Sequence, residues 1–240
     1  MRNIQIVAEE IYHVYNRGVD QRKIFMEDKD YQRFIHDLFE FNDENNVLNT
    51  GFRFNFTTMA TRQQYNRPRK LLVEILAFAL MPNHYHLFLR PKKDSGVAEF
   101  MKKVNGGYAQ YFNQKYDRSG VLFQGRFKAV LVKRDAHFMH LPYYIHANPL
   151  DLYMPEWRDG KLKDFMRAYN FLENYRWSSF PDYVGKKNYP SVTQREFLLD
   201  IADGTHGYKN SFLDWLRGMN LDVITDIILE NYGHPTAIIK

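Results

Sequence analysis

Two histidines, His84 and His86, are separated by one residue in the string HYHLFLR, which follows the turn at Pro82-Asn83. Side chains alternate across a β-strand, so both imidazoles would project from the same face of a sheet. Two imidazoles on one face can bind a metal ion if another element supplies a third ligand. The alternative is a pair of hydrogen-bonded histidines on a half-buried sheet.

A later segment, YYIHANP, could supply that ligand. Tyr144 and Asn148 are four residues apart and are therefore neighbours on one face of a helix, which could serve the histidine pair. Tyr143 lies about 100° further round such a helix, and we expect it to pack on the sheet. The chain has 17 tyrosines, so the alternative for Tyr144 is an ordinary core or surface aromatic residue.

The elements that must position these residues alternate in type along the chain. Hydrophobic spacing predicts helices over residues 96–116 and 135–148 and one with a buried stripe from Tyr31 to Phe41, capped by Asp28 or Asp30. It predicts strands over residues 10–16, 71–80, 84–90 and 125–134. The order β-α-β-β-α-β is typical of an α+β, ferredoxin-like (RRM-like) unit, an antiparallel sheet with helices on one face.

The residues that mark turns and element boundaries are less distinct in the part of the chain after Pro149. The string YRWSSFPDY predicts a docked loop, and the amphipathic residues beyond 190 predict a mainly helical C-terminal extension. We therefore expect a catalytic or binding domain over residues 1–189 and a helical extension of unassigned role over 190–240.

Charge is unevenly distributed. The chain carries a formal net charge of +5, yet from Arg195 to the end four basic residues stand against seven acidic ones. Eight basic residues lie between 101 and 134 with Asp117 as the only acid. A second basic cluster comprises Arg62, Arg67, Arg69 and Lys70. This segregation favours a polyanionic partner on one side of the molecule, although either cluster could also be a solvated face.

Composition limits the class of protein. With 45% hydrophobic and 25% charged residues, the chain is typical of a globular protein that buries a core. It has no cysteine, which excludes disulfides, thiolate metal sites and a cysteine nucleophile. No apolar run is long enough for a signal peptide or a membrane span, so we expect a cytoplasmic protein with no membrane partner.

Four strings resemble, in order and spacing, those of the single-tyrosine HUH transposases, and most closely the REP-associated tyrosine transposases. They are YHVYNRG (12–18), FALMPNHYHLFLR (78–90), GVLFQGRFKAVLV (120–132) and YYIHANP (143–149). The resemblance covers roughly residues 11 to 183, and residues 191–240 have no assignable counterpart. It implies a ferredoxin-like domain that cuts and rejoins hairpin-bearing single-stranded DNA through a 5′-phosphotyrosine intermediate.

The resemblance also implies roles for individual residues. Tyr144 matches the nucleophile, and His84, His86 and Asn148 match the metal ligands, with Mg²⁺ or Mn²⁺ as the expected ion. We assign contact with the DNA backbone to the basic residues of the matching strings and of the second basic cluster, because positive charge positions a strand without reading bases. These residues are Arg17, Arg126, Lys128, Arg62, Arg67, Arg69 and Lys70.

Several alternatives stay open. A hairpin-binding protein (REP-like) without strand transfer would not need the set of His84, His86, Tyr144 and Asn148. A metal-dependent hydrolase that uses water is another enzyme class. An RNA-binding module is a further alternative, but the sequence lacks the aromatic pattern expected of one. The sequence does not decide between a monomer and a homodimer, nor does it identify the hairpin or the cleavage site.

Overall fold

The computed structural model describes residues 5–45, 69–133, 135–219 and 221. The strands are β1 (Tyr12–Arg17), β2 (Val73–Met81), β3 (His84–Pro91) and β4 (Lys128–Leu131). The α-helices are α1 (Asp28–Glu40), α2 (Gly96–Lys115), α3 (Asp135–Ala147), α4 (Phe165–Asn174), α5 (Phe180–Tyr183), α6 (Glu196–Ile201) and α7 (Gly204–Arg217). Short 3-10 helices are η1 (Val19–Gln21), η3 (Asn148–Leu152) and η4 (Pro155–Asp159).

The strands form one antiparallel sheet in the order β2-β3-β1-β4. The predicted α+β class is confirmed, as is the hairpin of β2 and β3. Both crossovers, from β1 to β2 and from β3 to β4, run through a long helix. The first strand therefore lies in the interior of the sheet, between β3 and β4.

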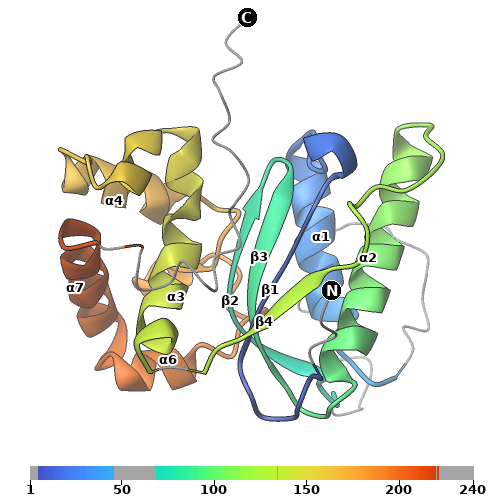
Figure 1. Cartoon of the computed structure of the whole chain (residues 1–240), viewed down its shortest axis with the longest axis horizontal. Coiled ribbons are helices and arrows are strands. Elements are labelled where there is room, and N and C mark those ends of the chain that lie inside the picture. The colour runs from blue at the N-terminus through green and yellow to red at the C-terminus, as the bar shows by residue number, and fades with distance from the viewer. Residues whose placement is uncertain (1–4, 46–68, 134, 220, 222–240) are drawn as a thin grey trace, which may run out of the picture.

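The sheet lies between two helical layers (Figure 1). Helices α1 and α2 cover one face, as the sequence predicted, and α3 with the later helices covers the other. The prediction of helices on one face is therefore incomplete. The second helical layer is needed because eight of the nine residues of β2, VEILAFALM, are buried, so both faces of the strand require an apolar cover.

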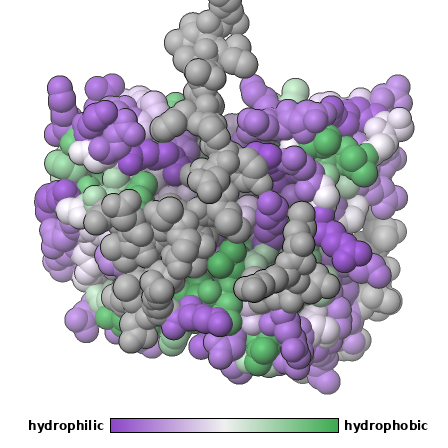
Figure 2. Space-filling model, viewed as in Figure 1, coloured by the Kyte–Doolittle hydropathy of each residue, from purple (hydrophilic) through white to green (hydrophobic). Residues whose placement is uncertain are grey.

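Each face of the sheet has its own hydrophobic core. The core under α1 and α2 includes Tyr12, Val14, Phe34, Tyr85 and Leu87. The core under α3 includes Phe88, Tyr144, Trp157, Tyr208 and Phe212. Hydrophilic residues predominate on the face drawn in Figure 2, with smaller hydrophobic areas between them. None of the described helices combines the length and the apolar character that crossing a membrane requires.

Two boundaries differ from the sequence prediction. The N-cap of α1 is Glu27, whereas Asp30 is buried and accepts hydrogen bonds from the backbone of Met26 (2.8 Å) and from Lys115 Nζ (2.5 Å). Strand β4 begins only at Lys128, because the chain bends at Gly125, whose φ is +71°. The predicted strand over residues 125–134 is therefore four residues long.

The string YRWSSFPDY docks along β2, as predicted. The backbone N–H of Leu80 donates to Trp177 O at 2.9 Å, and that of Ser179 donates to Phe78 O at 3.0 Å. The described part of the later chain continues the predicted helical character with α6 and α7. The boundary near residue 189 stays a prediction, although α7 packs directly on α3.

A buried histidine joins α3 to α7. His146 Nδ1 lies 2.8 Å from the Tyr208 hydroxyl, and its Nε2 lies 2.8 Å from the Ser179 hydroxyl. Burial lowers the pKa of His146 to about 3, so the ring is neutral, and a neutral imidazole needs one donor and one acceptor. Hydroxyl groups can serve either way. Tyr143 also faces α7, in ring contact with Tyr208 at 5.1 Å, and not the sheet as expected.

This network makes a stability prediction. We expect His146→Leu to lower the free energy of unfolding by about 2–4 kcal/mol, because it removes the hydrogen-bond partner of the buried Tyr208 hydroxyl and one of the partners of the Ser179 hydroxyl. Adding Tyr208→Phe to that variant should recover part of the loss, since one stranded hydroxyl is then absent. Urea unfolding of the single and double variants measures both effects. His206→Leu, at an exposed position of α7, is the control and should change stability by less than about 0.5 kcal/mol.

Candidate active site

The register of the sheet gathers polar residues on the face covered by α3. Arg17 of β1 lies opposite His84 of β3, and Tyr15 lies opposite His86. Lys128 of β4 lies opposite Tyr15 from the other side. Residues directly opposite each other in a ladder share a face, so these five side chains project toward the same side.

The two histidines of the HYH string are neighbours on that face. The ring centroids of His84 and His86 are 5.0 Å apart, with the ring planes at 87°. His84 Nδ1 lies 2.7 Å from Asn83 Oδ1, and a carboxamide oxygen can only accept. The proton of a neutral His84 is therefore on Nδ1, which leaves the Nε2 lone pair as the metal-binding position.

A third histidine, which the sequence analysis missed, supports His86. His13 Nε2 lies 2.9 Å from His86 Nδ1, and the two rings stack at 5.1 Å with 18° between their planes. His13 is 1% exposed. A hydrogen bond at one ring nitrogen fixes the orientation and tautomer of a histidine whose other nitrogen binds a metal. The signal was present in β1, but only the register with β3 shows which histidine His13 contacts.

The electrostatic environment favours neutral imidazoles. Burial lowers the pKa of His84 to about 4; the carboxylate of Asp151 opposes this shift, and Arg158 and Arg17 add to it. The pKa of His86 is also lowered, first by burial and then by the neighbouring His84 and His13. Neutral imidazole is the form that binds metal, so the pair is ready to accept an ion at neutral pH. In the described ranges no three His, Cys, Asp or Glu side chains gather as a metal cluster, so an ion would need another kind of ligand.

Tyr144 of α3 contacts the histidine pair, and Asn148 of η3 is joined to Tyr144 by a hydrogen bond. The Tyr144 ring is fully buried, and its centroid is 6.1 Å from that of His86, with the planes at 85°. Asn148, also fully buried, donates from Nδ2 to the backbone oxygen of Tyr144 at 2.8 Å. The histidine pair with an amide oxygen is a donor set that suits a divalent ion.

A second feature that the sequence analysis missed is an arginine that contacts both of these residues. Arg158 of η4 donates from Nη1 to the Tyr144 hydroxyl at 3.3 Å and from Nη2 to Asn148 Oδ1 at 3.1 Å. Its Nε and Nη2 also bind the two carboxylate oxygens of Asp151. No motif marks Arg158, because it follows the YYIHANP string by nine residues in a segment without periodicity.

The structure divides the basic residues assigned to DNA contact. Arg17 and Lys128 share the histidine face, and Arg126 is exposed in the bend before β4. Because β4 starts after Arg126, the alternation expected to align Arg126 with Lys128 does not apply. Arg17 is anchored by a hydrogen bond from Nε to Gln124 Oε1.

Two members of the second basic cluster, Arg69 and Lys70, are described by the structure, and they lie away from the histidine pair. Arg69 donates to the backbone oxygens of Phe39 and Asn42 at the end of α1, on the opposite face, and its guanidinium lies 4.1 Å from the Phe39 ring centroid. Val73, at the start of β2, pairs with Pro91, at the far end of β3 from His84. Arg69 and Lys70 precede that end of the sheet, and Arg62 and Arg67 lie outside the described residues.

The match to one protein-family model agrees with the family resemblance. The family model described as "Transposase IS200 like" matches residues 35–148, which include His84, His86, Tyr144 and Asn148. No curated protein matches the sequence. A solved structure of a REP-associated tyrosine transposase bound to a REP hairpin is similar at 16% identity and a TM-score of 0.45, over 80% of this chain and 88% of that chain. The match to the family model makes residues 35–148, just under half of the chain, similar to the IS200-like transposases.

Proposed function

We propose that the protein cuts and rejoins hairpin-bearing single-stranded DNA through a covalent bond to Tyr144. The observation that carries this proposal is the contact between the Tyr144 ring and His86, whose neighbour His84 shares its face. A phenol beside a pair of neutral imidazoles is a nucleophile beside a divalent-ion site. The match of residues 35–148 to the IS200-like transposase family model supports the same assignment.

In the cleavage step the Tyr144 oxygen attacks phosphorus and forms a new O–P bond. The bond from phosphorus to the 3′ oxygen breaks, and that oxygen takes up a proton while the phenol loses one. The products are a 5′-phosphotyrosine and a 3′-hydroxyl. The reverse step rejoins a strand, and it is feasible because a phenolate is a better leaving group than an alkoxide.

We assign the metal ligands to His84, His86 and Asn148, with Mg²⁺ or Mn²⁺ as the ion. A bound ion would place positive charge on the non-bridging phosphate oxygens. His13 would orient His86 through their 2.9 Å contact. The Asn148 oxygen has two lone pairs, so it can bind an ion while it accepts from Arg158.

The remaining assignments concern the scaffold and the DNA path. We infer that the βαββαβ unit is ferredoxin-like, which the element order and the interior place of β1 support. For the DNA path we propose Arg17 and Lys128 on the histidine face, with Arg126 at its edge. Arg69 is excluded from this proposal because its guanidinium binds the end of α1.

The first prediction of this proposal concerns the nucleophile. Tyr144→Phe removes only the hydroxyl, so we expect folding and hairpin binding to survive while the covalent protein–DNA adduct disappears. Tyr143→Phe is the matched control on the same helix and should form adduct at close to the wild-type rate. Denaturing electrophoresis of protein incubated with hairpin DNA and manganese measures the adduct. Wild-type protein that binds the hairpin yet forms no adduct would favour a binding protein without strand transfer.

The second prediction concerns the metal. We expect His84→Ala and His86→Ala to abolish both cleavage and tight Mn²⁺ binding, because a single imidazole cannot hold the ion. Asn148→Ala should weaken binding less and recover cleavage at raised manganese, since a neutral amide is the weakest donor of the three. Electron paramagnetic resonance of free Mn²⁺ measures the binding without DNA. Mn²⁺ affinity unchanged in both histidine variants would contradict the site, and His206→Ala serves as the control.

The third prediction concerns the salt dependence of hairpin binding. Replacing Arg17 and Lys128 by glutamine should reduce the slope of log affinity against log salt by about 1.4–1.8, the value for two phosphate contacts. Arg69→Gln should leave that slope unchanged. Fluorescence anisotropy over a range of salt concentrations measures it. A slope that changes with Arg69 and not with the pair would move the DNA path to the opposite face.

A further inference from the structure

The guanidinium of Arg158 is bound along one edge by the carboxylate of Asp151. Its Nε donates to Asp151 Oδ1 at 2.7 Å and its Nη2 to Asp151 Oδ2 at 2.6 Å, a bidentate pair. Trp157 Nε1 donates to the same Oδ1 at 2.7 Å. Only 18% of the Arg158 side chain is exposed. A bidentate pair of this kind fixes the plane of a guanidinium, which a lysine ammonium cannot reproduce.

The other edge of that guanidinium faces the two residues that η3 and α3 contribute to the site. Arg158 contacts the Tyr144 hydroxyl at 3.3 Å and Asn148 Oδ1 at 3.1 Å, and its central carbon is 5.6 Å from the Tyr144 ring centroid. One rigid cation therefore touches both the proposed nucleophile and the proposed amide ligand. The fixed positive charge lies beside the oxygen on which negative charge develops.

We propose that Arg158, held by Asp151, is the positioning residue of the Tyr144 hydroxyl and stabilises the phenolate oxygen in both cleavage and rejoining. This inference rests on the proposed function. A fixed charge acts strongly in a buried site, because little water screens it and no reorganisation is needed when the reaction occurs. In cleavage the Arg158 charge stabilises the Tyr144 oxygen as it attacks phosphorus. In rejoining it stabilises the same oxygen as it leaves phosphorus. Both rates should therefore depend on Arg158, whereas DNA affinity should not.

The central test separates the chemical step from binding. In single-turnover assays Arg158→Met should slow cleavage and rejoining by about 10²–10³-fold, the loss typical of one preorganised donor. The Kd for hairpin DNA should stay within about twofold. Arg158→Lys should recover part of the rate, because it restores the charge but not the bidentate geometry. Added guanidinium ion at matched ionic strength should accelerate Arg158→Ala.

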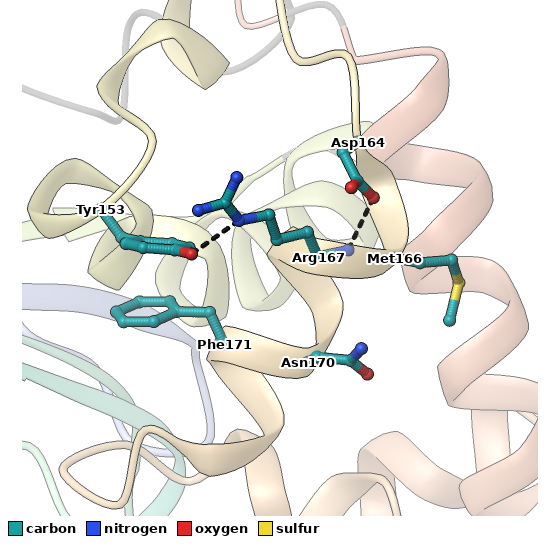
Figure 3. Close-up of a pocket in the computed structure, with 6 residues that line it drawn as sticks. All are labelled: Tyr153, Asp164, Met166, Arg167, Asn170 and Phe171. Carbon is teal, nitrogen blue, oxygen red and sulfur yellow. Dashed lines mark hydrogen bonds between the residues drawn. The ribbon is translucent and has the colours of Figure 1, made fainter.

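The chain offers a matched control in a second arginine–tyrosine pair. Arg167 of α4 donates from Nε to the Tyr153 hydroxyl at 2.6 Å, and its guanidinium lies 5.1 Å from that ring centroid. Figure 3 shows this pair in a surface pocket, where Tyr153 also stacks on Phe171. Arg167→Met removes the same kind of contact away from Tyr144, so both reaction rates should be unchanged.

A readout that does not depend on turnover uses 3-fluorotyrosine incorporated at position 144. Its ¹⁹F shift should change in Arg158→Met and stay constant in Arg167→Met, since only the first variant removes a charge beside that ring. Two results would overturn the inference and leave the Tyr144 assignment intact. One is cleavage by Arg158→Met at the wild-type rate. The other is a loss of rate that is matched by an equal loss of DNA binding and is not rescued by lysine or guanidinium. Failure of the wild-type protein to form any adduct would overturn the proposed function, and this inference with it.

Discussion

The register between β1 and β3 is the constraint on which the site depends. Pairing Tyr15 with His86 and Arg17 with His84 sends both histidines of β3 and Arg17 of β1 toward α3, on the same face as His13. A slip by one residue would turn the histidines toward the mainly apolar core under α1 and α2, away from His13. Burial of an unpaired imidazole costs free energy, so the contact between His13 and His86 also penalises that slip. Packing on the mainly apolar face of β1 and the His13–His86 contact on its other face thus favour the same register.

Helix α3 connects the sheet to the later helices, because it contacts β3 on one side and α7 on another. Tyr144 faces His86, whereas Tyr143 and His146 face α7 through Tyr208. The two sets lie on different sides of one helix, so rotation of α3 cannot improve one set without disturbing the other. Residues of α7 therefore support the position of Tyr144 although none of them touches it in the contacts described.

The sequence predicted what depends on local spacing. Alternation placed His84 and His86 on one face, the four-residue spacing placed Tyr144 beside Asn148, and the Pro82-Asn83 turn placed the hairpin. It could not predict contacts between distant segments. His13 lies 73 residues from His86, and their contact requires the register of the sheet.

The missed residues share a physical cause. Arg158 reaches Tyr144 and Asn148 because η3 and η4 fold back after α3. Within this turn the Asp151 carboxylate accepts hydrogen bonds from both Trp157 and Arg158. Neither 3-10 helix has a hydrophobic period that a sequence could reveal. Arg69 lies away from the histidine pair for a related reason: the carbonyl groups at the end of α1 require donors, and this nearby guanidinium supplies them. Charge along the sequence therefore located the basic residues, but competition among buried acceptors decided which of them lie at the site.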